Sequence, residues 1–141
     1  MIGVKYEEHF LNKNHLINNL NEAFHQQREG ALIIITCHQL AQLQQRISGG
    51  MSALGEAVKQ NIRESDQLLS CCDNMFVVVL SSIQTAEEVK VVTERLIAIL
   101  LSFEIDLLEL GLELRTALYP ADGRSGEELY LQAEIPGYIK A

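Results

Sequence analysis

The stretch from residue 63 to residue 80 constrains the fold more than any other part of the sequence. An extended run covers residues 67–70, a turn of small and polar residues covers 71–75, and an apolar run fills 76–80. Two extended runs joined by a short polar turn predict a β-hairpin. A charged pair, Arg63 and Asp66, stands just before it, and we expect this pair at the C-terminal end of a helix.

Periodic apolar residues predict helices and strands on both sides of the hairpin. The strand at 112–119 alternates apolar and polar residues, which predicts one solvated face. Thr85 and Glu88 have the spacing of a capping box, which predicts a helix start. Predicted helices cover residues 11–27, 51–64, 85–103 and 125–133, further strands cover 31–36 and 112–119, and residues 37–48 form a helix or an irregular turn. This order predicts one α/β sandwich, in which a sheet of four or more strands packs against helices.

Composition sets limits on the class of protein. The chain has 141 residues, 48% of them hydrophobic, and a net charge of −8, so we expect a single domain, residues 1–141, with a substantial core. The negative charge argues against a nucleic-acid partner, because basic side chains supply most of such affinity. Apolar runs are too short for a membrane span. Three cysteines without metal-ligand spacing suggest reduced thiols in a cytoplasmic protein.

Several motifs, taken in order, resemble those of GGDEF domains, the fold of diguanylate cyclases. Five residues separate Asp66, in the segment Arg63-x-x-Asp66, from the turn segment Cys72-Asp73-Asn74-Met75-Phe76. Residues 120–123 read Pro-Ala-Asp-Gly, and residues 10–13 and 133–141 match further family segments more loosely. The resemblance implies a nucleotidyl-cyclase-like α/β sandwich, whose central, mostly antiparallel sheet contains the hairpin and is flanked by helices.

The turn departs from the family signature, Gly-Gly-(Asp/Glu)-Glu-Phe. Cys72 and Asp73 replace the glycines that let a nucleotide approach the backbone. Asn74 replaces a metal-binding acid, and Met75 replaces the glutamate of the signature. The first strand also ends without the family's metal-binding aspartate. Because neutral side chains hold Mg²⁺ weakly, we expect a degenerate domain without cyclase activity, bound metal or cofactor.

The segment before the turn is intact. In the family, Arg-x-x-Asp forms an inhibitory site for cyclic di-GMP, and an arginine of the next helix joins it. Residues 93–96, Thr-Glu-Arg-Leu, match that helix segment and supply Arg95. Arginine suits the O6/N7 edge of guanine or a phosphate, and an aspartate can accept from guanine N1–H and N2–H₂. The resemblance thus implies a cyclic di-GMP receptor that uses Arg63, Asp66 and Arg95.

Simpler interpretations stand beside this one. Arg63 and Asp66 alone predict a surface ion pair, and Arg95 alone predicts a solvated helix residue. The domain is alternatively a ligand-independent interaction module that pairs with a cyclase, a phosphodiesterase, a secretion or motility complex, or a second copy, through exposed leucines at 107, 108 and 110. A third hypothesis is nucleotide binding at the altered turn without catalysis. Cys37 and His38 are adjacent but point to opposite faces of a strand, which argues against a nucleophile pair.

Overall fold

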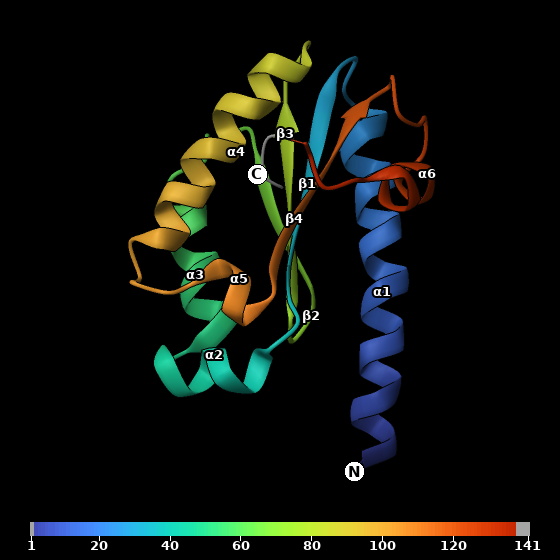
Figure 1. The fold of residues 1–141 in the computed structure, drawn as a ribbon. Helices are drawn as coiled ribbons and strands as arrows, with labels where there is room; N and C mark the ends of the chain where they lie inside the picture. Colours follow the sequence, from blue (N-terminus) through green and yellow to red (C-terminus); the bar gives the residue numbers. More distant parts are fainter. Residues whose placement is uncertain (1, 138–141) are drawn as a thin grey trace.

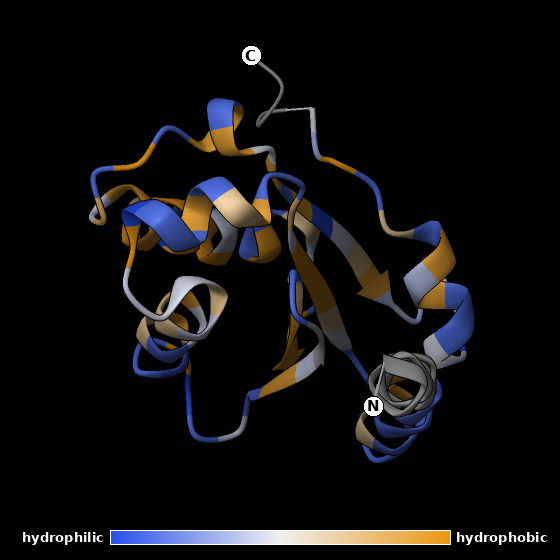
Figure 2. Ribbon diagram, turned by 90° about the horizontal axis from the view of Figure 1, so that it is seen from below, coloured by the Kyte–Doolittle hydropathy of each residue, from blue (hydrophilic) through white to orange (hydrophobic). Residues whose placement is uncertain are grey.

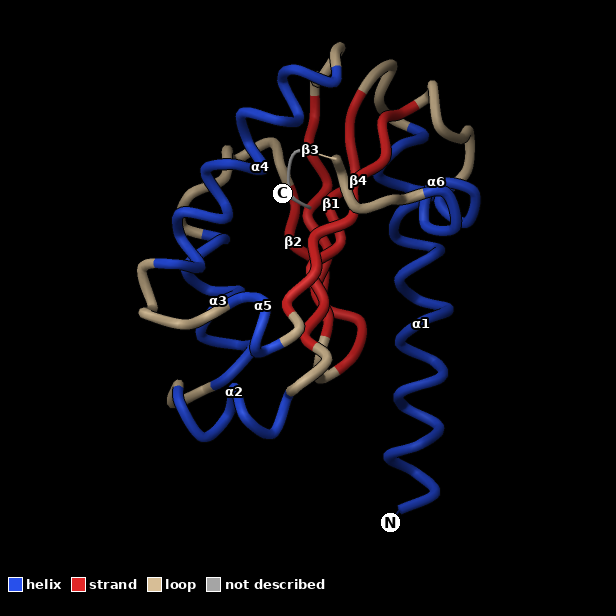
Figure 3. The backbone as a smooth tube through the Cα atoms, viewed as in Figure 1, coloured by secondary structure: helices blue, strands red, loops and turns tan. Residues whose placement is uncertain are grey.

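The computed structural model describes the backbone of residues 2–137 and the side chains of residues 14–70 and 73–137. A four-stranded sheet lies between two layers of helices (Figures 1 and 3). Its strand order is β2-β3-β1-β4, and every neighbouring pair is antiparallel. The strands are β1 (Gly30–Cys37), β2 (Gln67–Cys72), β3 (Met75–Ser81) and β4 (Leu112–Tyr119). The predicted α/β sandwich with a mostly antiparallel sheet and a hairpin is confirmed.

The helices divide between the two faces of the sheet. One face carries α1 (Ile2–His25) and α6 (Gly126–Gln132), and the other carries α2 (Leu40–Arg46), α3 (Gly50–Lys59), α4 (Ala86–Leu101) and α5 (Leu107–Leu110) (Figure 1). The strands are mostly hydrophobic, whereas the helices carry hydrophilic residues along their length (Figure 2). Within residues 2–137, no helix has the length and hydropathy needed to cross a membrane.

The central strand β1 is buried at every residue and pairs with a strand on each side. Its alternate side chains serve two separate cores: Ile33 and Ile35 pack toward α2–α5, and Leu32 and Ile34 pack toward α1. Burial on both faces explains why the run is apolar throughout.

Two local predictions hold well. Thr85 caps α4, and its hydroxyl accepts the backbone N–H of Glu88 at 3.3 Å. Ser125 caps α6 in the same way, accepting the N–H of Glu128 at 3.1 Å. Each cap satisfies a backbone donor that the first helical turn leaves open.

Other expectations need correction. The helix predicted at 51–64 ends at Lys59. The prediction ran too far because Ile62 continues the apolar period, although it packs against the core from outside the helix. The predicted solvated face of β4 is wrong, since Ala117 is buried against the α1 side. The first helix begins earlier than residue 11, α2 is shorter than the 37–48 segment, and α5 was not predicted.

Helix α6 docks on α1 at a glycine. The backbone N–H of Gly126 donates to Oδ1 of Asn21 at 2.6 Å. A Cβ at residue 126 would lie 2.7 Å from Cβ of Leu20 and 2.9 Å from the carbonyl oxygen of Ile17. The backbones therefore approach more closely than any side chain allows.

We expect Gly126→Ala to lower the free energy of unfolding by about 1–3 kcal/mol, because α6 must move away from α1. Gly137→Ala is the matched control, since a Cβ at residue 137 meets nothing within 4 Å. Urea denaturation followed by circular dichroism measures both variants. Equal stability of the two would contradict the close packing of α6 on α1.

Candidate functional site

Arg63 and Asp66 lie in the loop between α3 and β2, and the prediction that they end a helix is wrong. The helix stops at Lys59, and the Asn61 side chain donates to the carbonyl of Ala57 at 2.8 Å. The carboxylate of Asp66 accepts the backbone N–H of Arg63 at 2.9 Å. Such side-chain hydrogen bonds to the backbone compete with helical ones and favour a turn.

The Asp66 carboxylate is almost completely buried, with 3% of its side chain exposed. Oδ2 accepts from the backbone and Nε of Arg63, and Oδ1 accepts from Nη2 of Arg63 at 3.1 Å. Oδ1 also accepts the backbone N–H of Ser81 at 3.0 Å and its hydroxyl at 3.4 Å. Asp66 thus ties the α3–β2 loop to the end of β3.

The Arg63 side chain remains half-exposed, at 52%. Nε and Nη2 face Asp66, and Nη2 also donates to the carbonyl of Ser81. Across the described residues, no hydrogen bond engages Nη1. The structure therefore fixes the orientation of this cation and leaves Nη1 without a protein partner among the described residues.

Arg95 lies on the exposed side of α4. It is nine residues beyond Ala86, or about 14 Å along the helix axis. Among the residues that the structure describes, no hydrogen bond or ion pair joins it to Arg63, Asp66 or another side chain. The structure brings Arg63 and Asp66 together, but it does not place Arg95 in the same polar cluster.

The hairpin turn is tighter than predicted. Cys72 pairs with Met75, so only Asp73 and Asn74 form the turn, and a register shift lies between Ser70 and Cys72. The described non-glycine residues with positive φ do not include Asp73 or Asn74. The turn backbone therefore does not require glycine, although a nucleotide approaching it would meet side chains. The side chains of Cys71 and Cys72 lie outside the described set.

Asn74 connects the turn to the end of β1. Its carbonyl accepts the N–H of Cys37 at 2.8 Å, and its Nδ2 donates to the carbonyl of Cys37 at 3.3 Å. The resemblance noted in the sequence implies that two metal-binding positions fall on these two segments. The structure brings the segments together, with Asn74 bonded to the backbone of Cys37 and the Cys37 thiol buried on the carbonyl of Leu110.

Cys37 and His38 do not pair. The Cys37 thiol is buried and donates to the carbonyl of Leu110 at 3.4 Å, and burial raises its pKa. Nε2 of His38 instead lies 3.0 Å from Oε2 of Glu113. A buried thiol with a raised pKa is a poor nucleophile, which agrees with the expectation from strand geometry.

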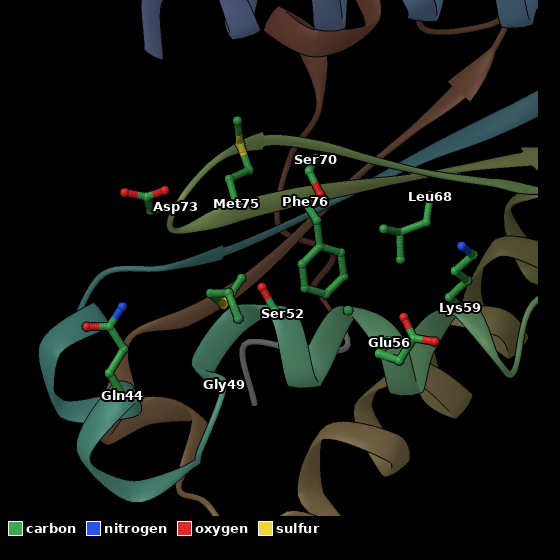
Figure 4. A pocket seen from close by; sticks show the side chains of 12 residues that line it. Gln44, Gly49, Ser52, Glu56, Lys59, Leu68, Ser70, Asp73, Met75 and Phe76 are labelled. Carbon is green, nitrogen blue, oxygen red and sulfur yellow. The ribbon is translucent and has the colours of Figure 1, made fainter. Parts of the chain in front are cut away.

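A groove of about 600 Å³ lies between α3 and the hairpin (Figure 4). Side chains of α3 face those of β2 and β3 across it, and α2 closes one end. Phe76 is buried at its base, against Gly55 of α3, whereas the Met75 side chain packs on the opposite, α1 face of the sheet. The sequence analysis missed the α3 side of this groove, although polar residues spaced three to four apart signalled it. The groove is lined by Gln44, Gly49, Met51, Ser52, Gly55, Glu56, Lys59, Leu68, Ser70, Asp73, Met75 and Phe76.

The donors near the turn do not suit a divalent metal. Within the described part of the chain, no group of three or more His, Cys, Asp or Glu side chains is placed to hold a metal ion. Asp73 is exposed at the turn, and the neighbouring Asn74 is bonded to Cys37. A single carboxylate beside a neutral amide is a weak site for Mg²⁺.

No protein-family model matches the sequence, and no curated protein matches it. Solved structures do match. A sensory box/GGDEF family protein from Caulobacter crescentus superposes with a TM-score of 0.67, at 20% identity over 85% of each chain. The GGDEF domain of YfiN from Pseudomonas aeruginosa superposes with a TM-score of 0.61, at 18% identity over 88% of this chain and 82% of that one.

This chain has the GGDEF fold. A third structure, the S helix-GGDEF-EAL segment of LapD from Vibrio cholerae, contains cyclic di-GMP. It superposes with a TM-score of 0.57, at 16% identity over 73% of this chain and 25% of that one. The resemblance noted in the sequence is thus confirmed for the fold, while the roles of Arg63, Asp66 and Arg95 stay predictions.

We expect Asp66→Asn to lower the free energy of unfolding by about 1–3 kcal/mol. An amide cannot accept from all of the donors that Arg63 and Ser81 direct at the buried carboxylate. Asp73→Asn makes the same chemical change at an exposed residue and should stay within about 0.5 kcal/mol of the parent protein. Chemical denaturation compares the two variants. An equal effect would show that the Asp66 hydrogen bonds do not hold the loop.

Proposed function

We propose that this domain is a catalytically inactive GGDEF-type signalling domain that binds cyclic di-GMP through Arg63, Asp66 and Arg95. The observation that carries the proposal is the Arg63–Asp66 pair, which presents a fixed and half-exposed arginine at the end of the hairpin opposite to the Asp73–Asn74 turn. At that turn, Asn74 is bonded to the backbone of Cys37. The GGDEF fold and the ligand in the LapD structure support the proposal. A cytoplasmic location, suggested by the cysteines, belongs to the same proposal.

Arg63 would make the direct contact. The O6/N7 edge of guanine and the oxygens of a phosphate both accept from a planar guanidinium. The two N–H groups of Nη1 have no protein partner among the described residues, so they can donate without breaking an internal bond. Asp66 would act chiefly by orienting Arg63, since a direct contact with guanine requires it to release one of its own hydrogen bonds.

Arg95 would supply the second positive charge. Its side chain is exposed on the helix that follows the strand end to which Asp66 is bonded. Cyclic di-GMP carries two phosphates, and a second arginine offsets the charge that Arg63 leaves uncompensated. Arg95 lies about 14 Å along α4 from Ala86, the first residue of the helix. A ligand would therefore span the space between the two arginines rather than lie in one compact pocket.

Inactivity follows from the charges around the turn. A GTP triphosphate needs cations, and the groove beside the turn offers Lys59 together with Glu56 and Asp73. Two carboxylates and one ammonium have a net negative charge, which repels a polyanion unless metal ions neutralise it. The buried thiol of Cys37 and the hydrogen-bonded amide of Asn74 do not suit such a metal.

Calorimetric titration of cyclic di-GMP tests the proposed binding site. We expect micromolar or tighter binding, and we expect Arg95→Ala to weaken it by about 1–3 kcal/mol, or roughly 5- to 150-fold. Arg95→Ala is more informative than Arg63→Ala, because the Arg95 side chain makes no hydrogen bond or ion pair among the described residues. Arg124→Ala is the matched control, since this exposed arginine follows β4 and precedes α6.

Arg63→Ala should also lose affinity for cyclic di-GMP, as Arg95→Ala does. Arg124→Ala should bind as tightly as the parent protein. If the parent protein gave no heat and no thermal shift with excess ligand, the receptor hypothesis would be wrong. If it bound but neither arginine mattered, the site assignment would be wrong.

We expect no conversion of GTP to cyclic di-GMP in the presence of Mg²⁺ or Mn²⁺. The reason is that the resemblance implies metal-binding acids where Asn74 and Cys37 stand, and Asn74 is hydrogen-bonded to the backbone of Cys37. Anion-exchange chromatography of the nucleotides after prolonged incubation measures turnover, with an active diguanylate cyclase as the positive control. Product above the level of a heat-denatured sample would contradict the proposed inactivity.

A second candidate is a ligand-independent interaction domain. Leu108 is 92% exposed on α5, and Val91 and Leu101 are exposed on α4. Of the three leucines named from the sequence, only Leu108 is free, because Leu110 is fully buried and Leu107 packs partly against the core. A negative titration with cyclic di-GMP would favour this second role.

A further inference from the structure

The internal hydrogen bonds of Arg63 determine which of its N–H groups a ligand can reach. Nε and Nη2 donate side by side to the two oxygens of Asp66, at 3.2 and 3.1 Å. Nη2 also donates to the backbone carbonyl of Ser81. Because Nη2 has two hydrogens, these bonds use both of them. Only the two N–H groups of Nη1 lack a partner among the described residues.

The Ser81 carbonyl is held firmly against Nη2. Ser81 lies beyond the residues of β3 that pair with β2, so its N–H and C=O groups bond to Asp66 and Arg63 instead. The N–H of Ser82 belongs to the same peptide unit as this carbonyl, and it donates to the carbonyl of Glu29 at 3.2 Å. The carbonyl therefore cannot turn away from Nη2 without breaking a second hydrogen bond.

These bonds remove the two-pronged contact by which arginine recognises guanine. That contact needs two parallel N–H groups, one for O6 and one for N7. A guanidinium has two edges that offer such a pair. Asp66 occupies the Nε–Nη2 edge, and the Ser81 carbonyl takes the remaining Nη2 hydrogen at the Nη1–Nη2 edge. Arg63 is left with a single free nitrogen.

Asp66 is equally closed to a base. Its carboxylate accepts four N–H groups, three from Arg63 and one from Ser81. A carboxylate has about four lone-pair sites, and 3% of this side chain is exposed. The N1–H and N2–H₂ groups of a guanine would therefore find no acceptor at Asp66.

A hydroxyl beside Arg63 offers a further donor. Ser65 is exposed, and its Oγ accepts the Ser81 hydroxyl at 2.8 Å. Its own hydrogen has no acceptor among the described residues. Nη1 of Arg63 and the Ser65 hydroxyl thus both lie next to Ser81 with hydrogens to donate. A phosphate oxygen accepts from such separate donors, because it has several lone pairs and needs no parallel pair.

We propose that this site binds the phosphodiester of a cyclic dinucleotide through Nη1 of Arg63 and the Ser65 hydroxyl, without distinguishing guanine from adenine. The inference rests on the proposed function and sets the ligand class of the same site: cyclic purine dinucleotides in general. Adenine has an amino donor where guanine has O6, but neither group meets a free partner at Arg63 or Asp66.

Calorimetric titration with cyclic di-GMP and with cyclic di-AMP, at the same salt concentration, tests the inference. We expect the two affinities to agree within about threefold, because the ligands share the phosphodiester ring and differ only in the bases. A two-pronged contact with guanine would instead favour cyclic di-GMP by roughly 5- to 150-fold.

Ser65→Ala tests the phosphate contact. The variant should weaken both nucleotides by the same factor, about three- to tenfold, because it removes a hydrogen bond to a charged group. Ser48→Ala is the matched control, since Ser48 is an exposed serine in the turn between α2 and α3. It should bind both nucleotides as the parent protein does.

The possible failures are distinguishable. A preference for either nucleotide beyond threefold would overturn the inferred base tolerance, while heat with cyclic di-GMP would still support the receptor hypothesis. Unchanged binding by Ser65→Ala, or an unequal effect on the two nucleotides, would overturn the phosphate contact. No heat with either nucleotide would overturn this inference and the proposed function together.

Discussion

Pairing of β1 on both of its edges is the constraint on which the rest of the structure depends. All eight residues of Gly30–Cys37 are buried, and the two sets of alternate side chains start the two cores. Gly30 shows how little room remains, since a Cβ there would lie 2.6 Å from the carbonyl oxygen of Leu80. The helices cover the two faces that this strand and its partners define.

Polar side chains secure both ends of β3. At its start, Asn74 exchanges hydrogen bonds with the backbone of Cys37. At its end, Asp66 accepts from Ser81 and Arg63. The Asn74 hydrogen bonds lie where the sequence resemblance implies metal-binding acids, and in this chain they join two segments. The second set holds a buried charge with enough donors to offset its loss of water.

Patterns with strong local physics were predictable from the sequence. The apolar run of β1, the hairpin and the caps at Thr85 and Ser125 each depend on neighbours close in sequence. The end of α3 was not predictable from periodicity, because Ile62 keeps the helical spacing while it packs from a loop. The second buried face of β4 was not predictable either. Alternation shows which residues are apolar and which are polar, but it does not show whether a layer of helices covers each face. Arg63 and Asp66 were found as a pair, whereas Ser81, which completes their cluster, carried no signal.

The burial of Asp66 bears on what Arg63 can do. A flexible arginine loses about 0.5–1.5 kcal/mol of rotamer freedom when a ligand immobilises it. Here the folded protein has already restricted the side chain through Nε and Nη2, and Nη1 keeps its donors. An acceptor atom of a ligand would therefore meet a cation whose orientation is set beforehand. The same bonds explain why a simple surface ion pair does not describe this site: the carboxylate is buried, and its first task is to shape the loop that presents the arginine.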